Sequence, residues 1–326
     1  MNTYLNRLAG IIVMTIATSL SPAIAQDYPT RLIHLIVPYS AGGSTDFVAR
    51  LYAKKLSERL GQAVVVDNRP GASTNIGSDV VARSTPDGYT LLFSDGAYIW
   101  NSVFGPVPPF DALTGLIPVG LVANTPFVVA ANPKTKFSTM KGLIAAAKLA
   151  PGKYTISSAS LRTFVELMNS RAGMKLLHIP YKGGAAATTD AIAGQVNLVY
   201  AALPVLLPFI QSGKLKPLAV TSLKRSPALA SVPSLSELGV DYDISIQYVV
   251  FVPAKTSALI QARLAQATEK VTSDKDFSKK LLVAGSEAVT MPPDELKAKV
   301  RRELTMWRQV AKDLPDLVNA DPSHPK

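Results

Sequence analysis

The sequence of 326 residues is 48% hydrophobic and 17% charged, with a formal net charge of +11, which is typical of a globular protein with a sizeable apolar core. It contains no cysteine, which excludes disulfide bonds and thiolate metal sites. The positive charge does not indicate a nucleic-acid partner, because no nucleic-acid-binding motif is present and many basic residues follow helical spacing near the C-terminus, as on a solvated face: Lys297, Lys299, Arg301, Arg302, Arg308 and Lys312.

The N-terminal segment 1–25 has the features of a secretory signal peptide. Arg7 precedes an apolar run from Leu8 to Leu20, and the small residues of Ala23-Ile24-Ala25 form a cleavage site. The run is too short to cross a membrane as a helix. We therefore expect an exported protein that is cleaved after Ala25 and does not span the membrane.

The next segment has the pattern strand, loop, helix. The apolar run Leu35–Val37 stops at Pro38, and beyond Gly42-Gly43 apolar residues recur at helical spacing from Ser44 or Thr45 to the stop at Gly61. A helix start attracts anions through its free amides and its dipole, and glycines leave room for one. The alternative is a turn that only leads the chain into its helix.

Two more predicted strands, Ala63–Asp67 and Tyr89–Phe93, flank a predicted helix at Asn75–Ser84. The order β-α-β-α-β predicts a parallel sheet with right-handed crossovers. Ligands of such sheets bind beyond the carboxyl ends of the strands. Both Pro38–Thr45 and Ser94–Trp100 lie at that edge, which favours a binding role for the glycine loop.

The Pro-rich passage Gly105–Phe110 is typical of a boundary region, and a second alternation of strands and helices follows it. Its expected elements are the strands Phe127–Ala131, Tyr154–Ser157, Lys175–Ile179, Gln195–Tyr200 and Leu215–Thr221 and the helices Thr139–Leu149, Leu161–Ala172, Gly184–Ala193 and Pro204–Gln211.

A further strand, Tyr248–Val252, precedes three predicted helices near Thr256–Ser273, Asp276–Ala284 and Pro292–Leu314. These helices need a surface to cover, and the first sheet has few helices of its own. We therefore expect the chain to return to the first lobe near Ile244–Val249.

Two such crossings predict an α/β protein of two lobes, each an α/β sheet domain, with a cleft between them. Lobe 1 would comprise residues 26–123 and 248–326, and lobe 2 residues 124–247. This length suits two domains of about 100–200 residues each.

Several motifs together resemble the Bug (TctC-like) periplasmic solute-binding receptors of tripartite tricarboxylate transport systems. They occur in order over nearly the whole chain after the signal peptide: Tyr28-Pro29, Ile36-Val37-Pro38-Tyr39-Ser40-Ala41-Gly42-Gly43-Ser44-Thr45-Asp46 with Arg50, Val66-Asp67-Asn68-Arg69-Pro70-Gly71-Ala72, Pro86-Asp87-Gly88-Tyr89-Thr90-Leu91-Leu92, Pro180-Tyr181-Lys182-Gly183, Gly213-Lys214-Leu215-Lys216-Pro217-Leu218-Ala219-Val220-Thr221, and Val232-Pro233-Ser234 with Glu237-Leu238-Gly239.

The resemblance implies a type II periplasmic-binding fold that closes by a hinge motion on a small carboxylate, such as an organic, amino or aromatic acid. It implies a monomer in the periplasm without a cofactor, whose partners are the ligand and integral-membrane transporter subunits. An alternative partner is a two-component sensor kinase, for which the protein would act as the ligand sensor.

The resemblance also implies site residues in both lobes. In lobe 1 the main chain of Tyr39, Ser40, Ala41, Gly42 and Gly43 would hold the carboxylate, with Ser94 at the same sheet edge. Asp46 would meet a polar or cationic part of the ligand, or it would simply favour the dipole of its own helix. The matching residues of lobe 2 are Ser157, Ser158, Ser160, Thr163, Tyr181 and Tyr200.

The second-lobe loop departs from the family pattern, which commonly reads Gly-x-Gly-Ser followed by His-Leu. Here Ser157–Phe164 lacks both glycines and the histidine, so its hydroxyls would bind the ligand or would serve as ordinary helix caps. Arg162 would pair with a carboxylate or stay solvated.

A second departure is Tyr200-Ala201-Ala202, where relatives often have an acidic or amide residue. With Tyr39, Tyr98 and Trp100 it suggests an apolar or aromatic ligand body, although aromatic residues at strand ends are more often part of the core.

An enzyme is the remaining alternative, and the sequence does not favour it. The chain has three histidines, of which His34 and His178 fall in apolar strands and His324 in the tail. It has no G-x-S-x-G or H-E-x-x-H motif. We therefore predict no catalysis, with a hydrolase built on the serines as the less favoured possibility.

Overall fold

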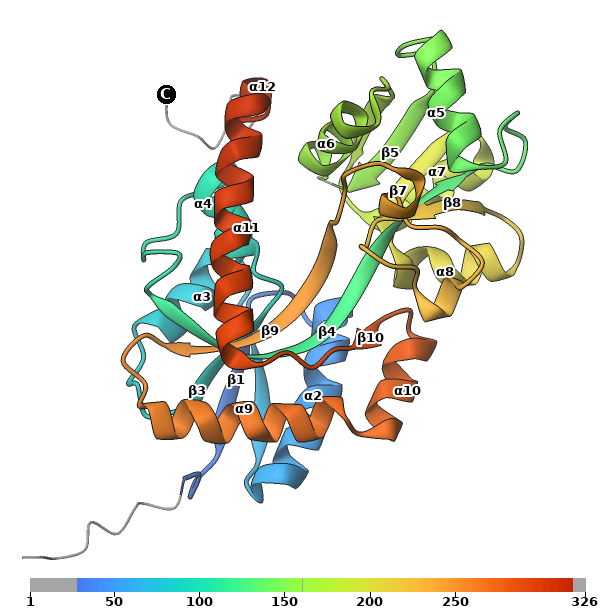
Figure 1. Ribbon diagram of the computed structural model, residues 1–326. Coiled ribbons are helices and arrows are strands. Elements are labelled where there is room, and N and C mark those ends of the chain that lie inside the picture. The colour runs from blue at the N-terminus through green and yellow to red at the C-terminus, as the bar shows by residue number, and fades with distance from the viewer. Residues whose placement is uncertain (1–27, 160, 319–326) are drawn as a thin grey trace, which may run out of the picture.

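The structure is a computed structural model that describes residues 28–159 and 161–318. The predicted signal peptide, its cleavage site after Ala25 and the candidate ligand residue Ser160 lie outside these residues. The described chain folds into two lobes, which Figure 1 shows side by side. The predicted bilobal α/β fold is confirmed.

The first lobe begins with the predicted β-α-β-α-β unit. Strand β1 (Ile33–Val37) pairs in parallel with β2 (Val64–Asn68) on one side and with β3 (Thr90–Ser94) on the other. The crossover helices are α2 (Ser44–Leu60) and α3 (Asn75–Ala82), with the short 3-10 turn Ala72–Thr74 before α3.

Helix α4 (Ala97–Phe104) begins shortly after β3, at the sheet edge that the sequence indicated, and the sequence did not predict a helix there. The Pro-rich passage after it leads to β4 (Leu116–Ala131), so this passage lies within the first lobe. The sequence predicted only the last residues of β4, because Pro118, Gly120 and Pro126 interrupt the strand pattern. Shifts of register beside Pro118 and Leu121 accommodate this irregular stretch.

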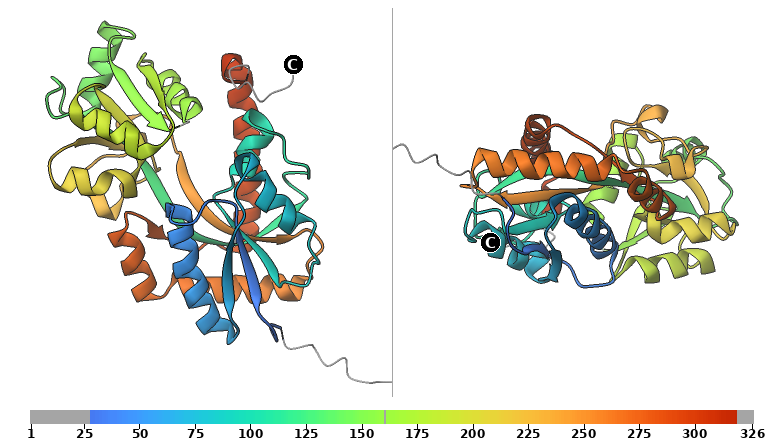
Figure 2. Two further views of the ribbon diagram at one scale, coloured as in Figure 1. Left: turned by 180° about the vertical axis from the view of Figure 1, so that it is seen from behind. Right: turned by 90° about the horizontal axis from the view of Figure 1, so that it is seen from below.

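Two long strands join the lobes. Strand β9 (Ser245–Pro253) runs antiparallel to β4 from the pair Leu116 and Pro253 to the pair Pro126 and Ser245. Beyond Pro126, β4 continues into the second sheet, so one sheet runs through both lobes in the order β2-β1-β3-β9-β4-β7-β5-β6. Figure 2 shows the same two strands bridging the lobes from behind.

The second lobe is built around the end of β4, which pairs with β7 on one side and with β8 on the other. Parallel to β7 run β5 and then β6. Its elements are α5 (Met140–Leu149), β5 (Thr155–Ala159), α6 (Arg162–Ala172), β6 (Leu177–Tyr181), α7 (Gly184–Ala193), β7 (Leu198–Ala202), α8 (Leu203–Gln211), β8 (Lys216–Val220) and the 3-10 turns Pro227–Leu229 and Ser236–Leu238.

The C-terminal helices return to the first lobe, as predicted. Helix α9 (Ala258–Thr272) packs on β4 and α2, and α11 (Pro293–Asp313) packs on α4 and β4. Between them lie α10 (Lys275–Val283) and the short strand β10 (Glu287–Ala288), and α12 (Pro315–Val318) follows α11. Figure 1 shows α11 standing along the side of the first lobe that faces α6.

Candidate functional site

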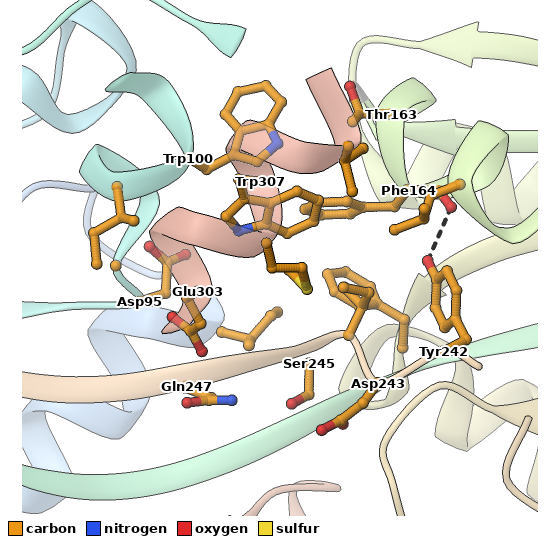
Figure 3. Close-up of a pocket in the computed structure, with 18 of the residues that line it drawn as sticks. Asp95, Trp100, Thr163, Phe164, Tyr242, Asp243, Ser245, Gln247, Glu303 and Trp307 are labelled. Atoms are coloured by element: carbon orange, nitrogen blue, oxygen red, sulfur yellow. Dashed lines mark hydrogen bonds between the residues drawn. The ribbon is translucent and has the colours of Figure 1, made fainter. Parts of the chain in front are cut away.

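A cavity of about 600 Å³ lies between the two lobes. Its first-lobe wall comes from Asp95 and Gly96 after β3, from α4 and from α11, and its second-lobe wall comes from one side of α6 as far as Arg171. Residues 241–247, which lead into β9, line it as well. Figure 3 shows the side chains around it. A cavity of this size suits a small organic ligand.

Three aromatic side chains meet across the lobes at this cavity. The rings of Trp100 on α4 and Trp307 on α11 lie 6.3 Å and 5.5 Å, centroid to centroid, from the ring of Phe164 on α6. Phe164 also packs on Phe127 of β4, with the ring centroids 5.7 Å apart. These rings give the cavity an apolar wall to which both lobes contribute.

Carboxylates and amide groups face the same cavity. Asp95 follows β3, Glu303 projects from α11, and Gln247 belongs to β9 (Figure 3). The Tyr39 hydroxyl donates a 2.5 Å hydrogen bond to Asp95 Oδ1, and the Ala97 amide donates another at 3.0 Å. Burial raises the pKa of Asp95, although these two hydrogen bonds oppose the rise.

Glu303 is a second carboxyl in the cavity wall, with a side chain that is 31% exposed. Its burial raises its pKa, against the opposing charge of Lys299, whose Nζ lies 3.6 Å from Glu303 Oε1. The apolar surroundings of the aromatic wall disfavour an uncompensated charge. The cavity wall carries charges of both signs, because Arg171, Lys299 and Arg302 line it together with the carboxylates.

The glycine loop of lobe 1 does not line this cavity, but the Tyr39 hydroxyl connects the loop to Asp95 in the cavity wall. Residues 40–43 are exposed, and Gly43 is the N-cap of α2 without a side-chain capping bond. Helix geometry leaves the first amides of α2 without intrahelical acceptors. The helix start is thus open to solvent, and the binding of an anion there by Ser40, Ala41, Gly42 and Gly43 stays a prediction.

Asp46 is occupied within the loop. It is 4% exposed, and its carboxylate accepts hydrogen bonds from the Gly42 amide at 3.0 Å, Arg50 Nε at 2.9 Å and Asn68 Nδ2 at 3.0 Å. Burial alone would raise the pKa of Asp46, but these bonds together lower it to about 2. Its geometry favours a structural role in shaping the loop.

The second-lobe serines point away from the cavity. Ser157 Oγ donates to the carbonyls of Ala187 and Leu198, and Ser158 Oγ lies 2.8 Å from His178 Nε2. Both serines are fully buried. The pair of Ser158 and His178 is therefore no exposed nucleophile.

Thr163, in the first turn of α6, does line the cavity. Arg162, which precedes it, is exposed. The other candidates stand at strand ends with partners inside the protein. The Tyr181 hydroxyl donates to Asp190 at 2.5 Å, and Tyr200 is buried with its hydroxyl 3.0 Å from that of Tyr242. Ser94 is buried as well, and its Oγ has no hydrogen-bond partner among the described residues.

Most residues that line the cavity were not predicted from the sequence. Asp95 follows the sheet edge that the sequence indicated, so it could have been found there. Phe164, Glu303 and Trp307 are ordinary members of helical patterns, and only their packing brings them together. Tyr242, whose hydroxyl donates to the Phe164 carbonyl at 2.9 Å (Figure 3), lies in a segment without a regular pattern.

Within residues 28–159 and 161–318, no group of three or more His, Asp or Glu side chains could hold a metal ion. None of the helices in those ranges is long and apolar enough to cross a membrane.

The sequence profile of a family described as the tripartite tricarboxylate transporter family receptor matches residues 48–315. Protein BugT of Bordetella pertussis is 34% identical over 318 residues, which cover 95% of this chain and 98% of the relative.

Solved structures show the same likeness. A protein of R. palustris solved with adipate is 32% identical with a TM-score of 0.74, over 87% of this chain and 97% of that one. The periplasmic binding protein BugD is 32% identical with a TM-score of 0.71, over 88% and 98%.

Proposed function

Because the chain belongs to the tripartite tricarboxylate transporter receptor family, we propose that this solute-binding receptor captures a small carboxylate between its lobes and delivers it to the membrane subunits of a transporter. It would do so in the periplasm, as a monomer and without a catalytic step. The predicted signal peptide and the receptor family support this location and role.

The open start of α2, which Tyr39 links to Asp95 in the wall of the inter-lobe cavity, is the observation that carries this proposal. A helix start stabilises an anion by about 0.3–1 kcal/mol when it is exposed and by up to about 2 kcal/mol when it is partly buried, and each charge-assisted hydrogen bond adds about 1.5–3 kcal/mol. Micromolar affinity corresponds to about 8 kcal/mol. A few such bonds from both lobes would be sufficient if the lobes exclude water around the ligand. The adipate complex of the R. palustris relative supports a carboxylate ligand.

A thermal-shift screen tests the proposal. Protein beginning at Gln26 would be unfolded, freed of retained ligand, refolded, and screened against dicarboxylates, amino acids, aromatic acids and sugars. A ligand at a hundred times its dissociation constant adds about 2.7 kcal/mol to the stability. We expect a shift with one or more acids. A response confined to sugars, or none at all, would contradict the proposal.

Gly43→Val is the matched variant for this screen. A Cβ at Gly43 would meet only the Ser40 carbonyl, at 3.7 Å, so the backbone tolerates it. The larger side chain would fill the space in front of α2 that the anion needs. We expect the melting temperature of the ligand-free protein to fall little and the ligand-induced rise in melting temperature to disappear. An unchanged shift would place the ligand elsewhere.

A further inference from the structure

We propose that the end of the second lobe that lies away from the first lobe is a docking surface for the head groups of an anionic phospholipid membrane. We call this surface the lysine edge. It consists of the exposed side chain of Leu149 and of six exposed lysines: Lys134, Lys136, Lys141, Lys148, Lys153 and Lys175. The proposal goes beyond the proposed function, because the lysine edge lies outside the cavity between the lobes.

The sequence concentrates its positive charge in the second lobe. Residues 124–247 contain 13 Lys and Arg residues against 5 Asp and Glu residues, which accounts for +8 of the net charge of +11. From residue 112 to residue 165 the chain has no Asp or Glu at all. All lysines of the lysine edge except Lys175 fall in this stretch, so they have no acidic neighbour in the sequence.

The sheet of the second lobe brings lysines from separate segments together. Lys134 and Lys136 follow β4, whereas Lys153 precedes β5 and Lys175 precedes β6. Strand β4 is antiparallel to β7, and β5 and β6 run parallel to β7. The end of β4 and the starts of β5 and β6 therefore share one edge of the sheet. The carboxyl ends of β5 and β6, which face the first lobe, lie at the opposite edge.

Side-chain and backbone contacts confirm this arrangement. The rings of Phe137 and Tyr154, each of which directly follows a lysine of the edge, pack edge to face with their centroids 5.3 Å apart. The Gly152 amide donates a 2.8 Å hydrogen bond to the Lys175 carbonyl. Helix α5, which carries Lys141 and Lys148, lies at the same end of the lobe (Figure 1). The six lysines thus form one continuous surface.

The charge of this surface is not neutralised inside the protein. The ion pairs within the second lobe join Arg171 to Asp241 and Arg225 to Glu237. Among the described residues, none of the six lysines of the edge takes part in an ion pair. Like charges gathered on one face attract an extended anionic partner.

The composition of the lysine edge favours a lipid surface over a protein surface. Protein interfaces are depleted in Lys and enriched in Arg and aromatic residues, and the lysine edge contains neither of the enriched types. The Lys ammonium group is a compact charge that does not need the planar partner that suits Arg. Leu149, which is 88% exposed at the end of α5, would enter the apolar layer below the head groups, with the stems of the lysines around it.

Sedimentation with lipid vesicles tests the proposal. Protein beginning at Gln26, which lacks the predicted signal peptide, would be mixed with vesicles of phosphatidylglycerol and phosphatidylcholine in equal amounts, or of phosphatidylcholine alone. Each lysine near an anionic surface increases the affinity about fivefold, so three in contact give about a hundredfold preference for the mixed vesicles. We expect this preference at low salt and its loss at about 1 M salt, where the Debye length is about 3 Å.

Lys141→Gln combined with Lys148→Gln removes two charges from α5 and should weaken binding to the mixed vesicles about 25-fold. Lys54→Gln combined with Lys270→Gln is the matched control. These two lysines are exposed on α2 and α9 of the first lobe, and among the described residues neither forms an ion pair. The control lowers the net charge equally and should change binding less than about twofold, because salt screens distant charges.

Leu149→Ser tests the apolar contact at constant charge and should weaken binding about tenfold. All these variants change exposed side chains, so they should keep the melting temperature and the ligand-induced shift of the unchanged protein.

The outcomes are distinguishable from those of the ligand screen. Equal binding to both kinds of vesicle, or binding to neither, would overturn the proposal and leave an acidic protein surface as the partner that fits these lysines. Equal losses in the two lysine pairs would show attraction by net charge and would overturn the assignment to the lysine edge. Neither result bears on the proposed function, which the thermal screen tests by itself.

Discussion

Asp46 illustrates how a residue can match a family motif and yet have its contacts inside the protein. Its carboxylate joins the Gly42 amide to Arg50 and Asn68 and so holds the glycine loop in shape. Both its possible roles, toward a ligand and toward its own helix, followed from the sequence. The geometry favours a structural role inside the protein over contact with a ligand, because all three of these contacts lie within the loop and its neighbours.

The low pKa of Asp46 predicts a pH-dependent contribution to stability. Its folded pKa of about 2 lies below the ordinary value of 3.8, so the contribution is present above about pH 4 and is lost as the pH falls toward 2. Its size is about 2 kcal/mol at neutral pH. We expect Asp46→Asn to lower the unfolding free energy by about this amount at pH 7 and by much less at pH 2.5, measured by urea denaturation.

Asp79→Asn is the control for this measurement. Asp79 forms an ion pair with Arg83 at the surface, and such a pair contributes at most about 1 kcal/mol to the unfolding free energy. A loss in Asp46→Asn that stays the same at both pH values would show that packing, and not charge, accounts for the effect.

The joining strand β4 depends on close packing against helix α9. At Gly120 a Cβ would lie 2.6 Å from Thr268 Cγ2, which is closer than real contacts allow. Thr268 is held by hydrogen bonds to the Tyr52 hydroxyl and the Leu264 carbonyl, so it cannot easily move. The glycine that made this strand hard to predict is therefore what lets the helix approach.

Gly120→Ala should destabilise the protein by about 1–3 kcal/mol, because it overpacks the contact between β4 and α9. Urea denaturation measures the effect. Gly184→Ala makes the same change where the nearest atom, Val205 Cγ1, lies at an ordinary 3.7 Å, and should leave stability nearly unchanged. Equal urea midpoints for the two variants would contradict the close approach of α9 to β4 at Gly120.

At the scale of the molecule, β4 and β9 connect lobes that also touch through the rings of Trp100, Phe164 and Trp307. A ligand between the lobes would contact both walls of the cavity and would favour an arrangement in which both lobes reach it. We therefore predict that binding changes the distance between the lobes.

The cysteine-free sequence makes this measurable by fluorescence energy transfer. Leu149→Cys on α5 and Leu259→Cys on α9 place two labels on different lobes, at side chains that are 88% and 71% exposed. We expect the transfer efficiency to change on addition of a ligand found in the thermal screen. In labelled protein that also carries the Gly43→Val substitution, the same ligand should leave the efficiency constant. Constant efficiency during saturating binding would rule out a hinge motion.

The sequence by itself determined most of the elements, though not α4 or the first part of β4, and the fold class, because the periodicity of apolar residues and the stops at Gly and Pro act over short distances. It predicted β1, the glycine loop and α2 together, and the family motifs identified the bilobal receptor fold. It also predicted that the C-terminal helices return to the first lobe.

Only the tertiary structure decided which side chains face the cavity. Ser157 and Ser158 match the position of a family binding loop, but their hydroxyls bond inward, and no local pattern shows this direction. Asp95, Phe164 and Glu303 are far apart in the sequence, and their meeting depends on how two lobes and α11 pack. The physical reason is that burial and long-range contacts orient side chains, whereas sequence patterns record only local spacing.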